Sequence, residues 1–120
     1  MSKKTLVLGA SLNPERYSYK AIKMLKDKMH EVNALGLKHG EVFGTTIDVQ
    51  QKPYEAIDTV TLYLSPKRQE AFYAYIMQLN PKRVIFNPGT ENPDFFKLLD
   101  RQNIAYEIAC TLVLLSTNQY

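Results

Sequence analysis

The stretch from Leu6 to Ser18, which reads LVLGASLNPERYS, constrains the fold of this chain more than any other. A short apolar run ends at Gly9, passes through a turn at Asn13 and Pro14, and opens into a helical pattern. Open α/β sheets bind phosphates at such junctions, because the first N–H groups of a helix lack intrahelical partners and carry partial positive charge. The stretch therefore predicts a nucleotide-like ligand, and it does not name a reaction.

The rest of the chain alternates short apolar runs with amphipathic segments. A helix is predicted from about Arg16 to His30, because apolar residues recur there at helical spacing and lysines fill most of the other positions. Two further helices are predicted at residues 65–79 and 92–101, each opened by a capping residue followed by proline. The predicted strands are Thr5–Leu8, Glu31–Leu35, Thr59–Leu64, Val84–Phe86 and Ile104–Ile108.

Three segments are less regular. Residues 41–49 are compatible with a further edge strand, and Pro53–Ile57 with one helical turn. The apolar tail Thr111–Leu115 fits a strand or a helix equally well.

This alternation predicts an α/β protein: a Rossmann-like, doubly wound, mostly parallel five-stranded sheet with helices on both faces. Residues 1–120 are expected to form one domain, since no linker, repeat or low-complexity segment interrupts the pattern. Ligands bind such sheets at the carboxyl ends of the strands, where the strand order reverses. The loops expected there are residues 9–14, 36–40, 65–66 and 87–91, which are rich in Gly, Pro, Ser or Asn.

Composition limits the class of partner. The 120 residues are 45% hydrophobic and 22% charged, as in a soluble globular protein. The net charge of +3 suits an anionic small molecule, and the dispersed basic residues argue against nucleic acid. One cysteine allows no intramolecular disulfide, and the first apolar run is too short for a signal peptide or membrane span. We therefore expect a cytoplasmic protein without membrane association.

The loop residues limit which nucleotide could bind. A dinucleotide fingerprint needs glycines where this chain has Ser11 and Pro14, and no acidic residue follows the second predicted strand to bind a ribose diol. Lys38 stands there instead, and it is compatible with a phosphate on or near the ribose or with a solvated loop lysine. NAD is disfavoured on these grounds, whereas NADP and coenzyme A, which both carry ribose phosphates, remain open.

Three other loop residues each have two interpretations. The Ser11 hydroxyl can donate to a phosphate oxygen or bond within its own turn. Arg16, near the start of the first predicted helix, can pair with a phosphate or lie on the surface. Gly89 suits either close backbone approach or an ordinary turn with positive φ.

Catalytic patterns are weak. His30 and His39 lack metal-type spacing to each other or to Cys110, so no metal site is predicted. No Ser-His-acid set, P-loop or paired-carboxylate motif is visible, and we predict no catalytic residue. Cys110 lies at the ligand end of the last predicted strand, where it is either a reactive thiol or a buried structural cysteine.

Several motifs together resemble the CoA-binding domain family, whose small Rossmann-like members are similar to the N-terminal domain of the succinyl-CoA synthetase alpha subunit. The motifs are V-L-G-A-S-L-N-P-E-R-Y-S-Y-K-A, the glycine Gly44, Y-L-S-P, N-P-G-T-E and the terminal cysteine. The resemblance spans roughly Lys4 to Cys110.

The resemblance implies a coenzyme A site along the strand ends. It implies that Gly9, Ala10, Ser11 and Asn13 line the first phosphate turn and that Lys38 meets the nucleotide end. Ser65 and Pro66 would then flank the adenine or pantetheine path, and Gly89 and Thr90 would close the far side.

The leading hypothesis from the sequence is a small-molecule binding module for coenzyme A or an acyl-CoA, without a catalytic centre of its own. One alternative is a module that senses NADP or another nucleotide. Another is a partner-binding protein that retains the fold and has lost its ligand. The apolar stretch Leu112–Leu115 is also suited to packing in a homodimer.

Overall fold

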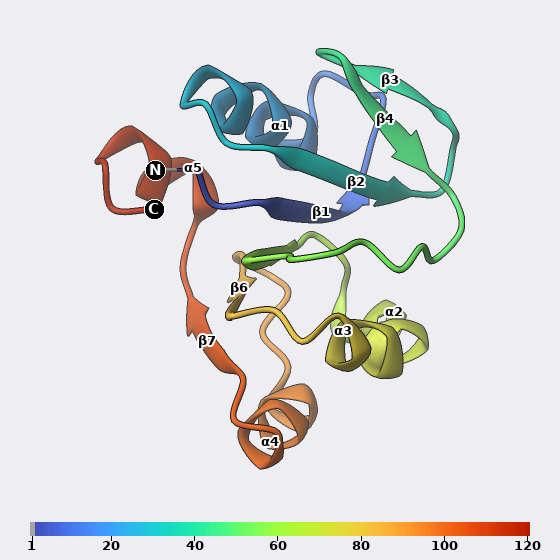
Figure 1. Cartoon of the computed structure of the whole chain (residues 1–120), viewed down its shortest axis with the longest axis vertical. Helices are drawn as coiled ribbons and strands as arrows, with labels where there is room; N and C mark the ends of the chain where they lie inside the picture. Colours follow the sequence, from blue (N-terminus) through green and yellow to red (C-terminus); the bar gives the residue numbers. More distant parts are fainter. Residues whose placement is uncertain (1) are drawn as a thin grey trace.

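Seven strands of residues 2–120, the part of the chain that the computed structural model describes, form one sheet in the order β3-β4-β2-β1-β5-β6-β7 (Figure 1). The strands are β1 (Thr5–Ala10), β2 (Val32–Gly36), β3 (Gly40–Val42), β4 (Thr45–Asp48), β5 (Thr59–Leu62), β6 (Arg83–Phe86) and β7 (Ala105–Ile108). The helical elements are α1 (Tyr17–Asp27), α2 (Pro66–Gln69), the 3₁₀ turn η1 (Glu70–Phe72), α3 (Tyr73–Leu79), α4 (Pro93–Arg101) and α5 (Thr111–Ser116).

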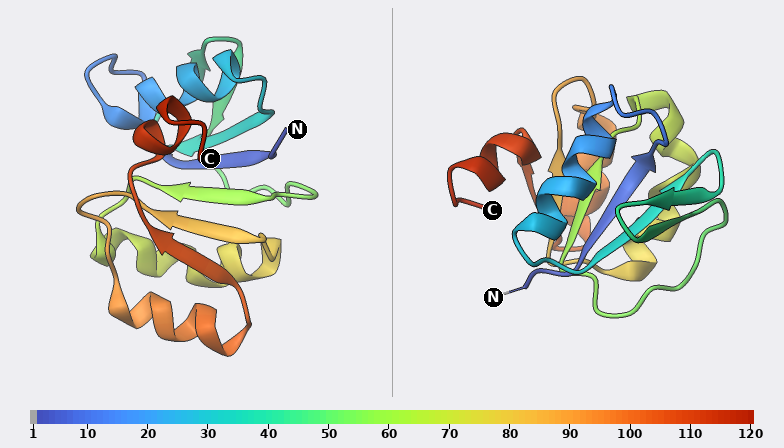
Figure 2. Two further views of the ribbon diagram at one scale, coloured as in Figure 1. Left: turned by 90° about the vertical axis from the view of Figure 1, so that its left-hand side faces the viewer. Right: turned by 90° about the horizontal axis from the view of Figure 1, so that it is seen from above.

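The sheet is mostly parallel. Neighbouring strands from β4 through β2, β1, β5 and β6 to β7 pair in parallel, and β3 pairs antiparallel with β4. The left view of Figure 2 shows β1, β5, β6 and β7 pointing the same way, so the loops that follow them gather at one edge. The mixed α/β Rossmann-like fold predicted from the alternation of strands and helices is confirmed.

The expected number of strands is wrong, because residues 40–48 form a hairpin of two strands. Its two-residue turn consists of Phe43 and Gly44, with φ of 48° and 78°. Positive φ at both turn positions matches the right-handed twist of the flanking strands. The sheet therefore has seven strands and not five.

Helices cover both faces of the sheet, as predicted (Figures 1 and 2). On one face α1 and α5 bury a cluster that includes Ile22, Leu25 and Leu115. On the other face α3 and α4 bury a larger cluster built around Phe86 and Phe95. The two clusters lie on opposite sides of β1, because Leu6 and Leu8 belong to the second cluster and Val7 to the first.

Helix boundaries differ from the predictions in three places. Helix α1 ends at Asp27, before His30, and Met29 takes a left-handed φ of 67° just after it. The helix predicted over residues 65–79 is divided into α2, η1 and α3. Residues 53–57 form no helical turn, whereas the ambiguous tail forms helix α5.

Candidate functional site

The strand order reverses at β1, which has β2 on one side and β5 on the other. Loops leaving β1 and β5 diverge from such a point, and the crevice between them is where open α/β sheets bind ligands. The loops after β2, β1, β5 and β6 follow one another along this edge in that order. The predicted site residues lie on these loops or at their ends: Gly9 and Ala10 end β1, Arg16 directly precedes α1, and Pro66 begins α2.

Two glycines let the strand ends approach closely. A Cβ atom on Gly9 would lie 3.0 Å from the Tyr63 carbonyl carbon and oxygen, and its φ of +96° also disfavours other residues. A Cβ atom on Gly36 would lie only 2.3 Å from the Ala10 carbonyl oxygen. Gly9 is also where the register between β1 and β2 shifts, so the end of β1 bends as it enters the loop. These glycines bring the ends of three strands close together at this edge.

The first loop is built from two consecutive side-chain turns. The Ser11 Oγ accepts a hydrogen bond from the Asn13 N–H at 3.0 Å. The Asn13 Oδ1 in turn accepts from the Glu15 N–H at 3.0 Å, and the Asn13 carbonyl oxygen accepts from the Arg16 N–H at 3.0 Å. The bond to Ser11 uses its oxygen and leaves its hydroxyl proton free to be donated. The Asn13 side chain therefore shapes the loop, and Arg16 is exposed at the start of α1.

Lys38 lies in the short link 37–39 between β2 and β3, on the opposite side of β1 from β5. Its side chain is exposed, and its neighbour Leu37 is 77% exposed. Leu12 of the first loop lies across from this link, because a Cβ atom on Gly40 would meet the Leu12 side chain at 2.6 Å. The ammonium group of Lys38 is thus displayed on a loop that borders the first loop.

The loops after β5 and β6 contribute the remaining predicted residues. Ser65 is exposed at the start of α2, and in the described chain its hydroxyl makes no capping hydrogen bond to that helix. Gly89 is also exposed, with a φ of +91°, and its N–H donates to the Glu91 carboxylate at 2.7 Å. Thr90 is buried, and its hydroxyl donates to the Asn87 carbonyl oxygen at 2.7 Å. Ser65 therefore exposes its hydroxyl group to solvent, whereas the Gly89 N–H is bonded to Glu91 and Thr90 holds its loop together.

A buried pair of amide side chains, which the sequence analysis did not assign to the site, joins these two loops. The fully buried Gln69 donates from Nε2 to the Leu64 carbonyl oxygen at 2.9 Å and to the Thr90 carbonyl oxygen at 2.8 Å. Its Oε1 accepts from Asn92 Nδ2 at 3.0 Å, and Asn92 Nδ2 also contacts the Tyr73 hydroxyl at 2.7 Å. A glutamine in the first turns of a predicted helix is typical of a solvated face, so no sequence signal revealed this pair.

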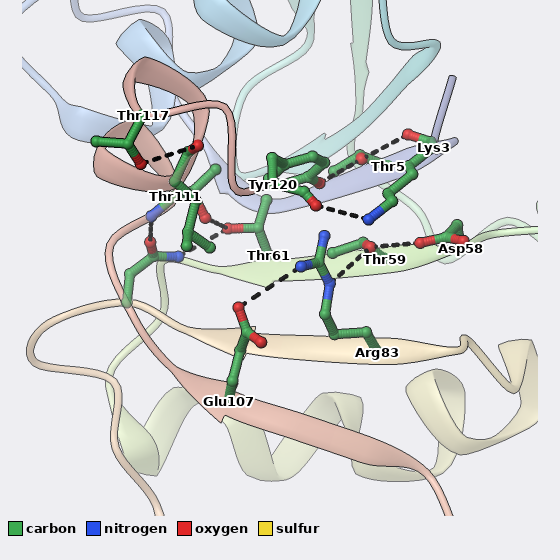
Figure 3. Close-up of polar contacts among 12 residues, drawn as sticks. Lys3, Thr5, Asp58, Thr59, Thr61, Arg83, Glu107, Thr111, Thr117 and Tyr120 are labelled. Carbon is green, nitrogen blue, oxygen red and sulfur yellow. Dashed lines mark hydrogen bonds and ion pairs between the residues drawn. The ribbon is translucent and has the colours of Figure 1, made fainter. Parts of the chain in front are cut away.

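A second buried network lies on the opposite face, beneath the N-terminus of α5 (Figure 3). The Thr61 and Thr111 hydroxyls are 2.8 Å apart. Asn87 Nδ2 donates to the Thr61 hydroxyl at 2.7 Å, and Asn87 Oδ1 accepts from the Thr111 N–H at 2.9 Å. Asn87 thus ties the end of β6 to β5 and to α5.

Two further titratable groups, Tyr63 and Cys110, lie near this edge. Burial raises the pKa of the Tyr63 phenol to about 12, so at pH 7 it is a neutral hydroxyl. Cys110 is half-buried where α5 begins. Among residues 2–120, no group of three or more His, Cys, Asp or Glu side chains could hold a metal ion. The polar groups on this edge are therefore suited to binding an anionic or hydroxyl-rich ligand.

None of the helices in residues 2–120 is long and apolar enough to cross a bilayer.

A Rossmann-like sheet of this kind defines a class of α/β proteins in which ligands bind at the carboxyl ends of the strands. Comparison with known families narrows the class. The family model described as CoA binding domain matches residues 3–116, and the chain belongs to this family. The resemblance noted from the sequence motifs is confirmed.

Solved structures agree on the fold. A crystal structure of an uncharacterised protein is 48% identical with a TM-score of 0.97, and the alignment covers 100% of this chain and 99% of that one. A Thermus thermophilus protein is 20% identical with a TM-score of 0.88, over 99% of this chain and 91% of the other. A hypothetical protein from Pyrococcus horikoshii OT3 is 26% identical with a TM-score of 0.85, over 97% and 83%. A search of curated proteins found no match.

Proposed function

We propose that this protein is a binding module for coenzyme A or an acyl-CoA, held along the carboxyl edge of the sheet. The observation that carries this proposal is the order β2-β1-β5-β6, which sets the loops containing Lys38, Gly9, Ser65 and Gly89 one after another. Coenzyme A is a linear molecule with a ribose phosphate at one end, a diphosphate in the middle and an uncharged pantetheine arm. Its charged and uncharged parts follow the same order as these loops.

The donor groups fit each part of such a ligand. In this proposal Lys38 pairs with the ribose 3′-phosphate through its exposed ammonium group. The diphosphate lies at the first loop, where backbone N–H groups around Gly9 and Ala10, the Ser11 hydroxyl and the N-terminus of α1 favour negative charge. Asn13 shapes this loop, and Arg16 adds positive charge at its far end.

The uncharged arm then passes between the loops after β5 and β6. Ser65 and Pro66 form one wall, and Gly89 forms the other, with Thr90 behind it as support. A Cβ atom on Gly89 would meet nothing within 4 Å, so the backbone there leaves open space beside it. These walls carry no cation, which suits an amide-containing arm better than a second phosphate.

Isothermal titration with coenzyme A, acetyl-CoA, NADP and NAD tests the proposal directly. We expect binding of both CoA species and weaker binding of NADP, since its 2′-phosphate can use Lys38 while its nicotinamide half differs from the arm. A clear preference for NADP would favour a nucleotide-sensing module, and no heat with either CoA species at millimolar concentration would overturn CoA binding.

We further propose that the module performs no chemistry on its ligand, because the groups on this edge are donors rather than a nucleophile paired with a base. Incubation with acetyl-CoA, followed by measurement of released thiol, tests this point. We expect to recover intact acetyl-CoA. Release of thiol that depends on the presence of the protein would contradict this proposal.

A further inference from the structure

We infer that Gln69 is a positioning residue that sets the spacing of the two loops flanking the pantetheine arm. This inference rests on the proposed function, because it assigns a role at the same site. Its basis is a buried side chain that contacts both loops through their backbone carbonyl groups.

The side-chain amide of Gln69 bridges the two loops. The two Nε2 hydrogens of Gln69 serve two different loops, at 2.9 Å to the Leu64 carbonyl oxygen and 2.8 Å to the Thr90 carbonyl oxygen. These carbonyls belong to the residues immediately before Ser65 and immediately after Gly89. A single planar NH₂ group with two acceptors fixes the distance between them within narrow limits.

The Gln69 amide is itself held in one orientation. Its Oε1 accepts from Asn92 Nδ2 at 3.0 Å, so the amide cannot turn over without placing two NH₂ groups against each other. The backbone N–H of Gln69 also donates to the Ser65 carbonyl oxygen at 3.1 Å. Gln69 and Asn92 are 0% and 4% exposed, so water does not compete for these bonds.

The hydrogen bonds of Gln69 are confined to one half of the site. Lys38 follows β2, which β1 separates from β5, and none of the hydrogen bonds of Gln69 reaches Lys38 or the first loop. The first loop meets this part of the site only through packing, because a Cβ atom on Gly9 would lie 3.2 Å from the Leu64 side chain. A change at Gln69 should therefore affect the half of the ligand that lies between the β5 and β6 loops. The nucleotide half, held at Lys38 and the first loop, should be unaffected.

The test compares two ligands and three variants of the full chain by isothermal titration. The ligands are coenzyme A and adenosine 3′,5′-bisphosphate, which lacks the arm. Gln69→Met keeps the side-chain length and removes the bridge. Asn92→Asp keeps an oxygen that can accept the hydrogen bond from the Phe95 N–H at the start of α4. It replaces the NH₂ group that donates to the Gln69 Oε1, so the Gln69 amide has to turn over and its bridge between the two loops is lost. Tyr73→Phe is the matched control, because it removes a bond to Asn92 without touching either loop.

We expect Gln69→Met and Asn92→Asp to weaken coenzyme A binding about tenfold, the size of one ordinary hydrogen-bonding interaction. Binding of adenosine 3′,5′-bisphosphate should stay within about twofold of wild type, and Tyr73→Phe should leave both affinities within the same range. Because two substitutions probe one bridge, the test survives if Gln69→Met fails to fold.

Two results would overturn the positioning role. One is wild-type affinity for coenzyme A in a folded variant that lacks the bridge, and the other is an equal loss for both ligands, which indicates a general loss of structure. If the wild-type protein itself binds no coenzyme A, the proposed function fails, and the role of Gln69 fails with it. The wild-type titration thus distinguishes the two failures.

Discussion

The carbonyl oxygen of Ala10 lies 2.3 Å from the position that a Cβ atom would take on Gly36. The two residues are partners across the parallel strands β1 and β2, just after the register shift at Gly9. A glycine at this position therefore lets two backbones meet at the edge where the candidate site begins.

Gly36→Ala should destabilise the protein, because the added methyl group overlaps the Ala10 backbone and no side chain can move out of its way. We expect a loss of about 3 kcal/mol in the free energy of unfolding, measured by urea denaturation. Gly89→Ala is the control, since it meets no atom within 4 Å and suffers only from its φ of +91°. Its cost should be about 1 kcal/mol, as expected for a left-handed residue. Equal costs for the two variants would contradict the close approach.

Lys38→Ala should weaken coenzyme A binding about tenfold and leave dephospho-CoA within about twofold, if the lysine pairs with the 3′-phosphate. Lys97→Ala is the control, because Lys97 is also exposed but lies on α4. Titrations at two salt concentrations should show a smaller salt dependence in Lys38→Ala than in wild type. An equal loss for coenzyme A and dephospho-CoA would exclude this pairing.

The Tyr54 hydroxyl donates to the Asp48 carboxylate, which also accepts from Lys52 Nζ at 2.9 Å. The bond from Tyr54, followed by that from Lys52, holds the pKa of Asp48 below its ordinary value of 3.8. Stabilisation from this group is therefore present above pH 3.8 and is lost as the pH falls toward the lower folded-state pKa.

Tyr54→Phe should cost about 1.5 kcal/mol at pH 7 and less at pH 3, as measured by urea denaturation. Tyr75→Phe is the control, because the Tyr75 hydroxyl donates to the neutral Lys52 carbonyl oxygen at 2.6 Å. Its cost should be the same at both pH values. A pH-independent cost for Tyr54→Phe would argue against the link to Asp48.

His30 is expected to make stability depend on pH in a higher range than Asp48 does. Its Nδ1 accepts a hydrogen bond from the Lys3 N–H at 2.9 Å, which requires that this nitrogen carry no proton. Burial, and then the positive charges of Lys3 and Arg83, lower the pKa of His30 below 6.5. The unfolded chain therefore binds the proton more readily, and stability should fall as the pH drops below 6.5 toward the folded-state pKa.

His30→Asn keeps an acceptor near the position of Nδ1 and removes the titration. The fall in stability between pH 7 and pH 5 should be smaller in this variant than in wild type, as followed by thermal denaturation. The exposed His39 is present in both proteins and cancels from the comparison. Parallel pH profiles for the two proteins would contradict a lowered pKa at His30.

Much of the fold could be predicted because the local signals agree with the tertiary structure. The apolar spacing of Ala21, Ile22 and Leu25 matches the buried face of α1, and Asn92 with Pro93 begins α4 with a side-chain cap. The β3–β4 hairpin could not be predicted in the same way, since its turn begins with Phe43, a residue that seldom takes positive φ. Its Phe43 ring instead packs against Tyr19, at 5.2 Å between centroids, which is a tertiary contact.

In the candidate site, too, features with a local sequence signal could be predicted and features that depend on tertiary contacts could not. Glycine and serine loops after apolar runs are local features, so the edge could be predicted from them. The buried amides of Gln69 and Asn87 could not, because both are polar residues whose burial depends on loops distant in sequence. Helix α5 was ambiguous for a related reason: it is six residues long, and only its packing against α1 favours a helix over a strand.

A crystal structure of this protein with coenzyme A tests the central claim most directly. We expect the diphosphate against the N–H groups of the first loop, the 3′-phosphate within hydrogen-bond distance of Lys38 Nζ, and the pantetheine arm between Ser65 and Gly89. Ligand density at any place other than the carboxyl edge of β2, β1, β5 and β6 would contradict the account.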